Sequence, residues 1–335
     1  MASPRPYAYF RDRWATDLIE VSHDPAVLDT QGWWAVVMTY EGEFTGARFA
    51  DVRTTAHPRA TWRAVAPDSW SSSMSQDVYV EAVELVRAAI ASGEVYQANV
   101  CRVLSAALPR AADLTGLAWL LQAHHPASHS GTVLLPEHGL QVVSASPELF
   151  LQRRERTLTS SPIKGTAKTA EGLLVKDSAE NVMIVDLVRN DLGIVCQTGS
   201  ISVPSLLALE SFPGLVHLVS TVQGTLADGY GWPDILKATF PPGSVTGAPK
   251  SSALRIIDAV ERAPRGPYCG AIGWVDADAA AAELAVGIRT FWAVDDVLHF
   301  GTGAGITWGS DPLREWDETT LKAERLLEVA GRAST

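Results

Sequence analysis

The chain has 335 residues, of which 47% are hydrophobic and 19% are charged, a composition typical of a globular protein. Its formal net charge of −11 argues against nucleic acid or an anionic membrane surface as the main partner, although a local positive cluster can still bind a small anion. The three cysteines are far apart, and neither a signal peptide nor an apolar stretch of membrane-spanning length is visible, so we expect a cytoplasmic protein that does not cross a membrane.

The predicted elements begin with a buried strand over 33–40, followed by a surface connection over 51–73. Ser73 and Gln76 predict a capping box for a helix that reaches about Ser92, where Gly93 provides a stop signal. Further strands are expected at 95–104, 131–135, 140–145 and 149–151.

The second half of the chain continues this mixture of elements. A second helix is predicted over about 176–190, and a third begins after Pro249 and ends near Val260. The last helix opens with Asp311 as its cap and Pro312 in its first turn. Strands are expected between these helices at 270–275, 283–294 and 297–302. Because strands and helices form separate groups, we predict an α+β fold in one domain.

Two of the predicted helices carry carboxylates on one face. Asp177 and Glu180 lie three residues apart in the second helix, and Glu315, Glu318 and Lys322 follow spacings of three and four in the last one. Carboxylates from two helices can bind one magnesium ion, which accepts few protein ligands and keeps water or substrate oxygens. For either helix alone, a solvated face with a Glu318–Lys322 salt bridge is the simpler interpretation.

Glycine-rich segments indicate anion binding but not nucleotide binding. Residues 243–250 form a turn that runs into a helix start, which suits a carboxylate, but their spacing is not that of a phosphate loop. Residues 301–305 end a strand instead of opening a dinucleotide-binding helix. No Gly-x-Ser-x-Gly or Gly-x-Cys-x-Gly elbow is present in the sequence, which argues against a hydrolase or a built-in glutaminase.

Lys164 stands out because the sequence has only six lysines among its 27 basic residues. It lies in the segment Pro-Ile-Lys-Gly-Thr over 162–166. A lysine amine can lose its proton on burial and act as a nucleophile, whereas a guanidinium group stays charged. Taken alone, a lysine in an exposed loop is an equally good interpretation.

Eight motifs, taken in order and spacing, closely resemble the chorismate-utilising enzymes, a family that includes anthranilate, aminodeoxychorismate, isochorismate and salicylate synthases. The motifs cover 146–148, 162–166, 180–191, 217–220, 243–250, 268–270, 288–290 and 303–305. The resemblance implies two orthogonally packed antiparallel sheets flanked by helices in four layers. It also implies one chorismate-binding domain over 1–335, with a shortened N-terminal portion over 1–72 and a catalytic core over 73–330.

The resemblance further implies the residues of the site. Mg²⁺ is expected at Glu180 and Glu318, with Asp177 and Glu315 close by. Glu148 is implied as the general acid that protonates the departing C4 hydroxyl, and His217 as its orienting partner. The groups expected to meet the carboxylates of chorismate are Thr246, Tyr268, Arg289, Lys322 and the backbone amides near Gly303.

Two positions distinguish the reactions within the family. Members that add water carry a lysine base in the segment matching 94–97, where this chain has Gln97, so isochorismate and salicylate synthesis are disfavoured. Anthranilate synthases resemble Pro-Ile-Ala-Gly-Thr around position 164, whereas aminodeoxychorismate synthases carry lysine there. The resemblance therefore implies that Lys164 attacks C2 of chorismate and that ammonia resolves the adduct at C4. The product would be 4-amino-4-deoxychorismate, the precursor of p-aminobenzoate.

This role requires an unprotonated lysine amine. A lysine with an ordinary pKa of about 10.4 is almost wholly protonated at neutral pH. Burial, or positive charge from Mg²⁺ and Lys322, would lower that pKa. We therefore expect Lys164 to lie in a desolvated or positively charged environment.

The ammonia source and two alternatives complete the expectations. Because the sequence shows no glutaminase triad, we expect a separate glutamine amidotransferase subunit as partner. The same fold that aminates C2 would give anthranilate or 2-amino-2-deoxyisochorismate, but Lys164 would block that carbon. A non-catalytic chorismate-binding relative is the second alternative, and the intact set Glu148, Lys164, Glu180, His217 and Glu318 argues against it.

Overall fold

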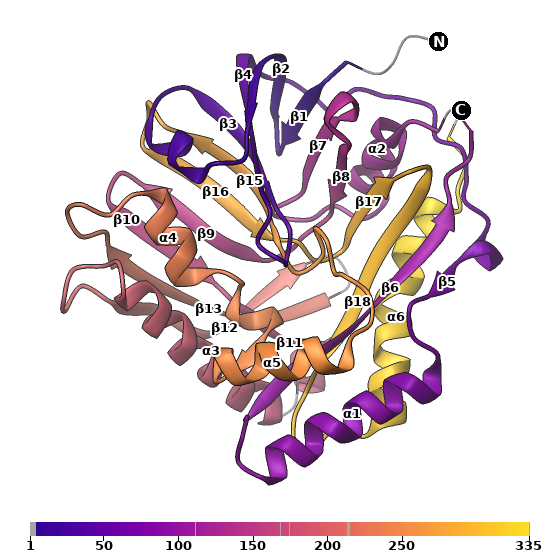
Figure 1. The fold of residues 1–335 in the computed structure, drawn as a ribbon, viewed down its shortest axis with the longest axis vertical. Helices are drawn as coiled ribbons and strands as arrows, with labels where there is room; N and C mark the ends of the chain where they lie inside the picture. Colours follow the sequence, from indigo (N-terminus) through magenta and orange to yellow (C-terminus); the bar gives the residue numbers. More distant parts are fainter. Residues whose placement is uncertain (1–4, 111, 168, 174, 213–214, 335) are drawn as a thin grey trace.

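The computed structural model describes residues 5–110, 112–167, 169–173, 175–212 and 215–334 (Figure 1). The paired strands in this part of the chain are antiparallel and form one continuous series of neighbours. From one end to the other, the series is β12 (Ser202–Phe212), β13 (Leu215–Thr225), β10 (Thr157–Ser161), β9 (Leu149–Arg154), β16 (Ala281–Val286), β15 (Ala271–Asp276), β3 (Trp33–Met38), β4 (Phe44–Thr54), β2 (Arg13–Ser22), β1 (Tyr7–Phe10), β7 (Gly131–Leu135), β8 (Leu140–Ser144), β17 (Thr290–Val294), β18 (Val297–Ile306) and β6 (Gln97–Ala107).

Short strands extend the two ends of this series. β11 (Ile163–Ala167) pairs with β13, whereas β5 (Ser71–Ser72) and β14 (Gly247–Ala248) pair with β6. The predicted α+β class is confirmed, and the pairings connect the sheets expected from the resemblance into one network through β1, which pairs with both β2 and β7.

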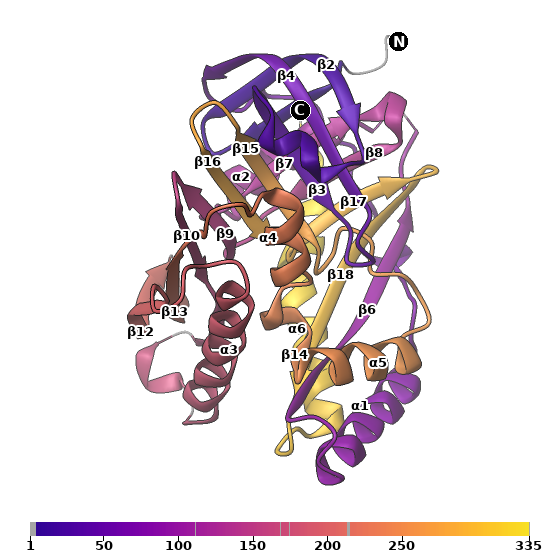
Figure 2. The same cartoon turned by 60° about the vertical axis from the view of Figure 1, so that its left-hand side comes forward.

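Helices cover both ends of the network (Figure 2). α3 (Val175–Gly193) packs against β11, β12 and β13, and α6 (Pro312–Ala330) packs against β18. The remaining helices are α1 (Gln76–Ala91), α2 (Leu114–His124), α4 (Trp232–Thr239) and α5 (Lys250–Val260), with single 3₁₀ turns η1 (Pro25–Asp29), η2 (Pro67–Ser69), η3 (Pro136–His138), η4 (Ala170–Gly172) and η5 (Gly243–Val245). None of the helices in the described part of the chain is long and apolar enough to cross a membrane.

The helices predicted from the sequence correspond to α1, α3, α5 and α6, whereas α2 and α4 are not predicted, and one of the predicted caps is wrong. Asp311 caps α6 by accepting a hydrogen bond from the Arg314 N–H at 3.0 Å, as its position before Pro312 predicts. The predicted cap of α1 is wrong, because Ser75 and not Ser73 accepts from the first turn. The Ser73 hydroxyl instead accepts from the Val103 N–H at 3.0 Å and so ties the segment to β6.

Two predicted segments differ in the structure. The strand expected over 283–294 is divided into β16 and β17, because Arg289 takes a φ of 52° in the left-handed region and interrupts the extended run. The surface connection expected over 51–73 begins inside β4 and contains Trp62, which is 1% exposed. The Trp62 indole N–H donates to the Ala330 carbonyl at 2.8 Å, which attaches this segment to the end of α6.

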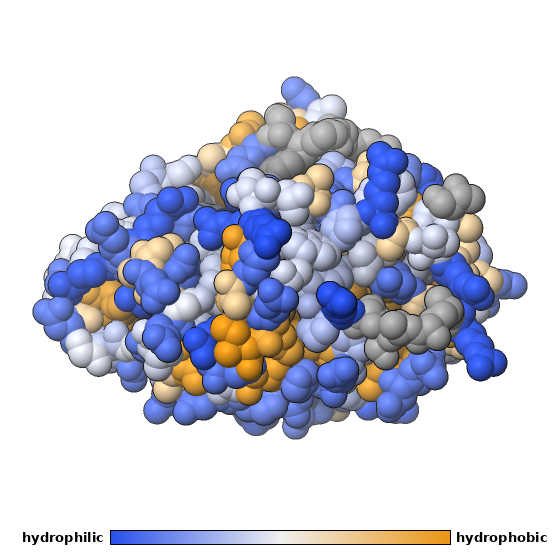
Figure 3. All heavy atoms as spheres, turned by 90° about the horizontal axis from the view of Figure 1, so that it is seen from above, coloured by the Kyte–Doolittle hydropathy of each residue, from blue (hydrophilic) through white to orange (hydrophobic). Residues whose placement is uncertain are grey.

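The apolar interior explains why these elements pack. The largest buried cluster joins β3, β15 and β16 to α3 and α4, with Trp34, Val36 and Leu284 among its most buried members. A second cluster lies under α2 and α6, where Leu117 and Leu326 are almost fully buried. Seen from above, the surface is mostly hydrophilic, with apolar residues gathered mainly in one area (Figure 3). Burial of such side chains stabilises the fold by about 1.5–3 kcal/mol each.

Candidate active site

Lys164 lies in β11 at an irregularity of the sheet. Ile163 pairs with Val219 and Thr166 pairs with His217, so the register shifts by one residue across Lys164 and Gly165. Gly165 has a φ of 86°, and a Cβ atom on it would lie 2.8 Å from the Cβ of Asp177 in α3. Glycine is therefore required both for the backbone conformation and for the close approach of α3. An irregularity of this kind can redirect a side chain out of the regular strand alternation, and Lys164 lies within it.

The environment of Lys164 favours loss of its proton. Burial is the largest effect on the pKa of this amine and lowers it from its ordinary value. The carboxylates of Glu180, Glu148 and Glu318 act against that lowering, whereas the Lys322 ammonium group adds to it. The expectation of a desolvated lysine near positive charge is therefore consistent with the described surroundings.

Glu148 is buried beside this lysine and is 4% exposed. Both polar groups of its backbone are hydrogen-bonded. The N–H donates to the Ser146 hydroxyl at 3.2 Å, and the carbonyl accepts from the Val286 N–H at 3.0 Å. Burial raises the pKa of the Glu148 carboxyl to about 7, against the opposing effects of a Ser244 hydrogen bond and the Lys164 charge. Such a carboxyl can carry a proton near neutral pH, which a general acid requires.

Carboxylates from two helices act on Lys164. Glu180 of α3 and Glu318 of α6 both act on its pKa. The Lys322 ammonium lies 2.7 Å from a Glu318 carboxylate oxygen and donates to the Gly303 carbonyl at 3.1 Å, which confirms the predicted salt bridge.

Among the residues that the structure describes, no three His, Cys, Asp or Glu side chains lie close enough to form a metal site by themselves. Magnesium accepts two carboxylates and completes its shell with water or substrate oxygens, so the donor set of Glu180 and Glu318 suits it. The other two acidic residues of these helices have different neighbours. Asp177 packs on Gly165, and Glu315 is buried near the Tyr79 hydroxyl.

Arg289 is a second positive group that acts on Glu148. Its field opposes the raised pKa of Glu148, and together with burial it lowers the pKa of His217 to about 4. His217 is 2% exposed and opposes Thr166 across the β11–β13 ladder. A histidine with this pKa is neutral near pH 7, so it suits a hydrogen-bonding role and not that of a cation.

Tyr268 and Thr246 are buried, and their described hydrogen bonds are made to the protein. The Tyr268 hydroxyl is 4.0 Å from the sulfur of Cys101 in β6. The Thr246 hydroxyl donates to the carbonyls of Pro242 and Gly243 at 3.1 and 3.2 Å. Neither residue has a described contact to Lys164 or Glu148, so their role in substrate binding stays a prediction.

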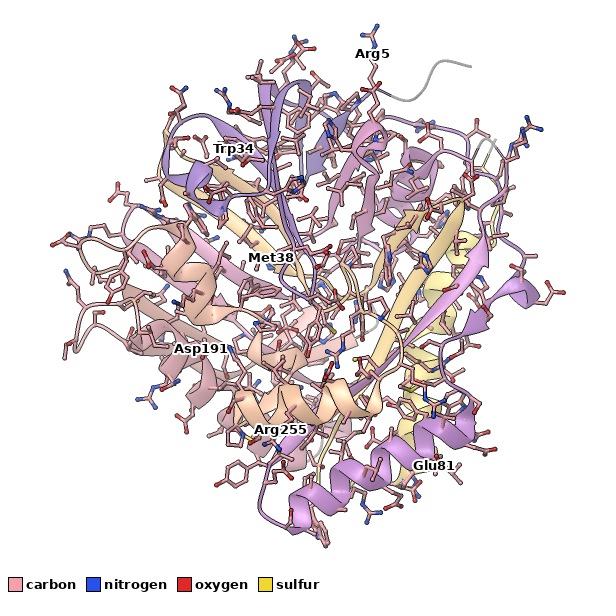
Figure 4. All side chains as sticks on the ribbon, in the orientation of Figure 1. Arg5, Trp34, Met38, Glu81, Asp191 and Arg255 are labelled. Carbon is pink, nitrogen blue, oxygen red and sulfur yellow. The ribbon has the colours of Figure 1, made fainter. Side chains whose placement is uncertain are left out.

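An ion pair that the sequence does not predict joins Lys250 to α3. The Lys250 ammonium lies 2.7 Å from an Asp191 carboxylate oxygen and 3.1 Å from the Thr239 carbonyl. Asp191, labelled at the end of α3 in Figure 4, has its pKa raised to about 6 by burial. A cavity of about 20 Å³, large enough for one water molecule, is lined by both Asp191 and Glu148. Lys250 therefore binds a carboxylate of the protein itself at the end of the glycine-rich motif.

Comparison with protein families gives one extended match. The family described as "chorismate binding enzyme" matches residues 26–328. Anthranilate synthase component 1 of Streptomyces coelicolor is 37% identical over 276 residues, covering 79% of this chain and 53% of that protein. Aminodeoxychorismate synthase component 1 of Klebsiella aerogenes is 37% identical over 271 residues, covering 77% and 59%. The chain spans somewhat more than half the length of these two relatives.

Solved structures share the fold across almost the whole chain. Anthranilate synthase component I of Streptococcus pneumoniae has a TM-score of 0.81 at 21% identity, covering 98% of this chain and 93% of that one. The menaquinone-specific isochorismate synthase of Escherichia coli has a TM-score of 0.80 at 18% identity, covering 98% and 89%. At these identities the likeness establishes the fold alone.

Proposed function

The chain belongs to the family of chorismate binding enzymes, and on that premise we propose that it is a magnesium-dependent aminodeoxychorismate synthase acting on chorismate and ammonia. Relatives named for two different reactions are equally similar to it, so overall similarity does not choose between them. The observation that carries the proposal is the lowered pKa of Lys164, whose charge and that of the Glu148 carboxyl each act on the pKa of the other.

The proposed reaction requires an unprotonated Lys164 amine and a protonated Glu148 carboxyl. The lone pair of the unprotonated Lys164 amine forms a bond to C2, and the ring double bonds shift. The C4–O bond then breaks, and the hydroxyl takes the Glu148 proton and leaves as water. Ammonia attacks C4 of the covalent adduct, the double bonds shift back, and the C2–N bond breaks to release Lys164. A proton from the incoming nitrogen returns to the Glu148 carboxylate, which completes the cycle.

Substrate binding is proposed to use the remaining predicted residues. Arg289 would hold one carboxylate in a bidentate contact, because its planar guanidinium matches the carboxylate geometry. Lys322 and the backbone near Gly303 are joined by a hydrogen bond and would act together on a second anionic group, with Tyr268 and Thr246 nearby. Glu180 and Glu318 would hold Mg²⁺, which would neutralise negative charge on the substrate when bound.

The source of ammonia is proposed to be a partner protein. The relatives named component 1 imply a second component by that name. We propose that it is a glutamine amidotransferase subunit and that the product serves p-aminobenzoate synthesis. Gln97, which is 1% exposed in β6, supports amination over addition of water, because an amide side chain cannot take a proton from water.

Product identification tests this proposal directly. The pure chain is incubated with chorismate, Mg²⁺ and ammonium, and the products are identified by mass spectrometry and fluorescence. We expect 4-amino-4-deoxychorismate and no fluorescent anthranilate. Anthranilate or 2-amino-2-deoxyisochorismate as the main product would instead establish the second candidate, which the relatives named anthranilate synthase favour. Tight chorismate binding without turnover from any nitrogen source would indicate a non-catalytic relative.

A further inference from the structure

His125 lies at the C-terminal end of α2 and contacts Arg289 from the side of that helix. Its Nε2 atom is 3.4 Å from Nη1 of Arg289, and its backbone N–H donates to the Leu121 carbonyl at 2.7 Å. A guanidinium group has only donors, so the ring nitrogen must be the acceptor of this hydrogen bond. Nε2 is therefore assigned as unprotonated, and the ring hydrogen is on Nδ1.

The surroundings of His125 keep the ring neutral. Burial, Arg289 and Arg325 of α6 together lower its pKa to about 4. Near neutral pH the imidazole therefore keeps the lone pair that Arg289 needs as an acceptor. His125 also lines a cavity of about 20 Å³, large enough for one water molecule, together with His57, Thr132 and Ser144.

The backbone of Arg289 is already fixed by its neighbours. Its φ of 52° is unusual for a residue other than glycine, and such conformations persist where the surrounding structure holds them. The Arg289 carbonyl accepts from the Ala145 N–H at 3.0 Å, and the hydroxyls of Ser144 and Thr290 are 2.8 Å apart next to it. These contacts hold the main chain but not the long side chain, whose end is held by His125.

We propose that His125 is a positioning residue that orients the Arg289 guanidinium for binding a carboxylate of the substrate. Arg289 extends far enough to act on both Glu148 and His217, so the orientation of its planar fork determines where the substrate carboxylate lies relative to the acid. Without the ring acceptor, the guanidinium loses a hydrogen-bond partner, and we expect its bidentate orientation to be less populated. The inference rests on the proposed function, since it takes Arg289 to be the carboxylate-binding group.

Two substitutions at one position test this role. His125→Leu keeps much of the volume but removes the acceptor, and His125→Gln places an amide oxygen close to the Nε2 position. His124→Ala is the matched control, because His124 is exposed on the same helical turn. Each variant is first checked for an unchanged melting temperature. KM and kcat for chorismate are then measured with ammonium, and chorismate binding is measured by calorimetry.

We expect His125→Leu to raise the KM and the dissociation constant for chorismate about tenfold with a smaller change in kcat, as loss of one charged hydrogen bond predicts. His125→Gln should return both constants to within about threefold of the parent, and His124→Ala should change neither. A folded His125→Leu protein with parental KM overturns the proposal, and so does a folded His125→Gln protein that is no better than the leucine variant.

Arg289→Ala separates failure of this inference from failure of the proposed function. If Arg289→Ala loses chorismate binding while His125→Leu keeps it, only the positioning role of His125 is wrong. If Arg289→Ala binds chorismate as tightly as the parent, the carboxylate contact in the proposed function is wrong, and the role of His125 is overturned with it.

Discussion

Lys250 and Lys164 have different surroundings, because one has its own carboxylate partner and the other shares its carboxylates with further groups. Lys250 has two acceptors committed to it, an Asp191 oxygen at 2.7 Å and the Thr239 carbonyl at 3.1 Å. The carboxylates that act on Lys164 also bind other groups. Glu148 accepts hydrogen bonds from Ser244 and Ile163, and Glu318 forms a salt bridge with Lys322.

The acceptors around each lysine indicate what its removal should change. The Lys250 ammonium group has its own carboxylate and joins two elements, α3 and the start of α5. At Lys164 burial outweighs the shared carboxylates, and the pKa falls. Removal of the first lysine should therefore damage the fold, whereas removal of the second should damage the reaction.

The largest effect is expected for Lys164→Ala. Loss of the nucleophile should lower formation of 4-amino-4-deoxychorismate at least about a thousandfold, because no other group can form the C2 bond. Lys164→Arg should be equally inactive, since guanidinium stays protonated. Product is measured by mass spectrometry, with the exposed Lys237→Ala as control. Unchanged output from Lys164→Ala would refute the nucleophile role but leave the family assignment intact.

Lys250→Met should have the opposite outcome. It leaves the buried Asp191 carboxylate without its partner, and we expect a loss of about 2–4 kcal/mol in the free energy of unfolding. Denaturant titration measures that loss, and turnover per folded molecule should fall far less than in Lys164→Ala. The double variant Lys250→Met with Asp191→Leu should recover part of the stability. If the single variant is as stable as the parent, the ion pair does not hold α3 to α5.

The origin of the two environments also shows what can be predicted from the sequence. Caps such as Asp311 were identified because their partners lie within one turn. The bulge at Lys164 was not, because it depends on the register with β13, more than 50 residues away. The partner of Lys250 was missed for the same reason, since Asp191 is 59 residues from it. The break at Arg289 was missed because a non-glycine residue gives no local sign of a left-handed conformation.

The resemblance predicts candidate site residues but not the contacts that support them. It predicts Glu148, Lys164, Glu180 and Glu318. In the structure, the three carboxylates all act on the pKa of Lys164. Their supports belong to segments with no chemical signature of their own. His125 ends a helix that was not predicted, so nothing in the local sequence connects it with Arg289.

Glu148 provides a smaller effect that can be read from the pH dependence of stability. Its pKa rises from the ordinary 4.5 to about 7 on folding, so the folded state binds more protons than the unfolded state between these values. Stability from this group is therefore fully present below about pH 4.5 and is lost as the pH rises through about 7. Glu148→Gln should remove this dependence and gain about 2–3 kcal/mol relative to the parent between pH 5 and pH 8. Equal pH slopes for both proteins would contradict the raised pKa.

Ser244→Ala should give the smallest effect, and it tests the segment that joins the two lysine environments. Ser244 donates to Glu148, and Lys250, six residues further along, binds Asp191. The Ser244 hydrogen bond favours the charged carboxylate, so its loss should raise the pKa of Glu148 by about half to one unit. The fall in kcat at alkaline pH, where the acid loses its proton, should move upward by the same amount, while the melting temperature at pH 5 changes little. A shift to lower pH would mean that the hydroxyl stabilises the protonated acid. In that case the glycine-rich segment would raise the pKa of Glu148 instead of lowering it.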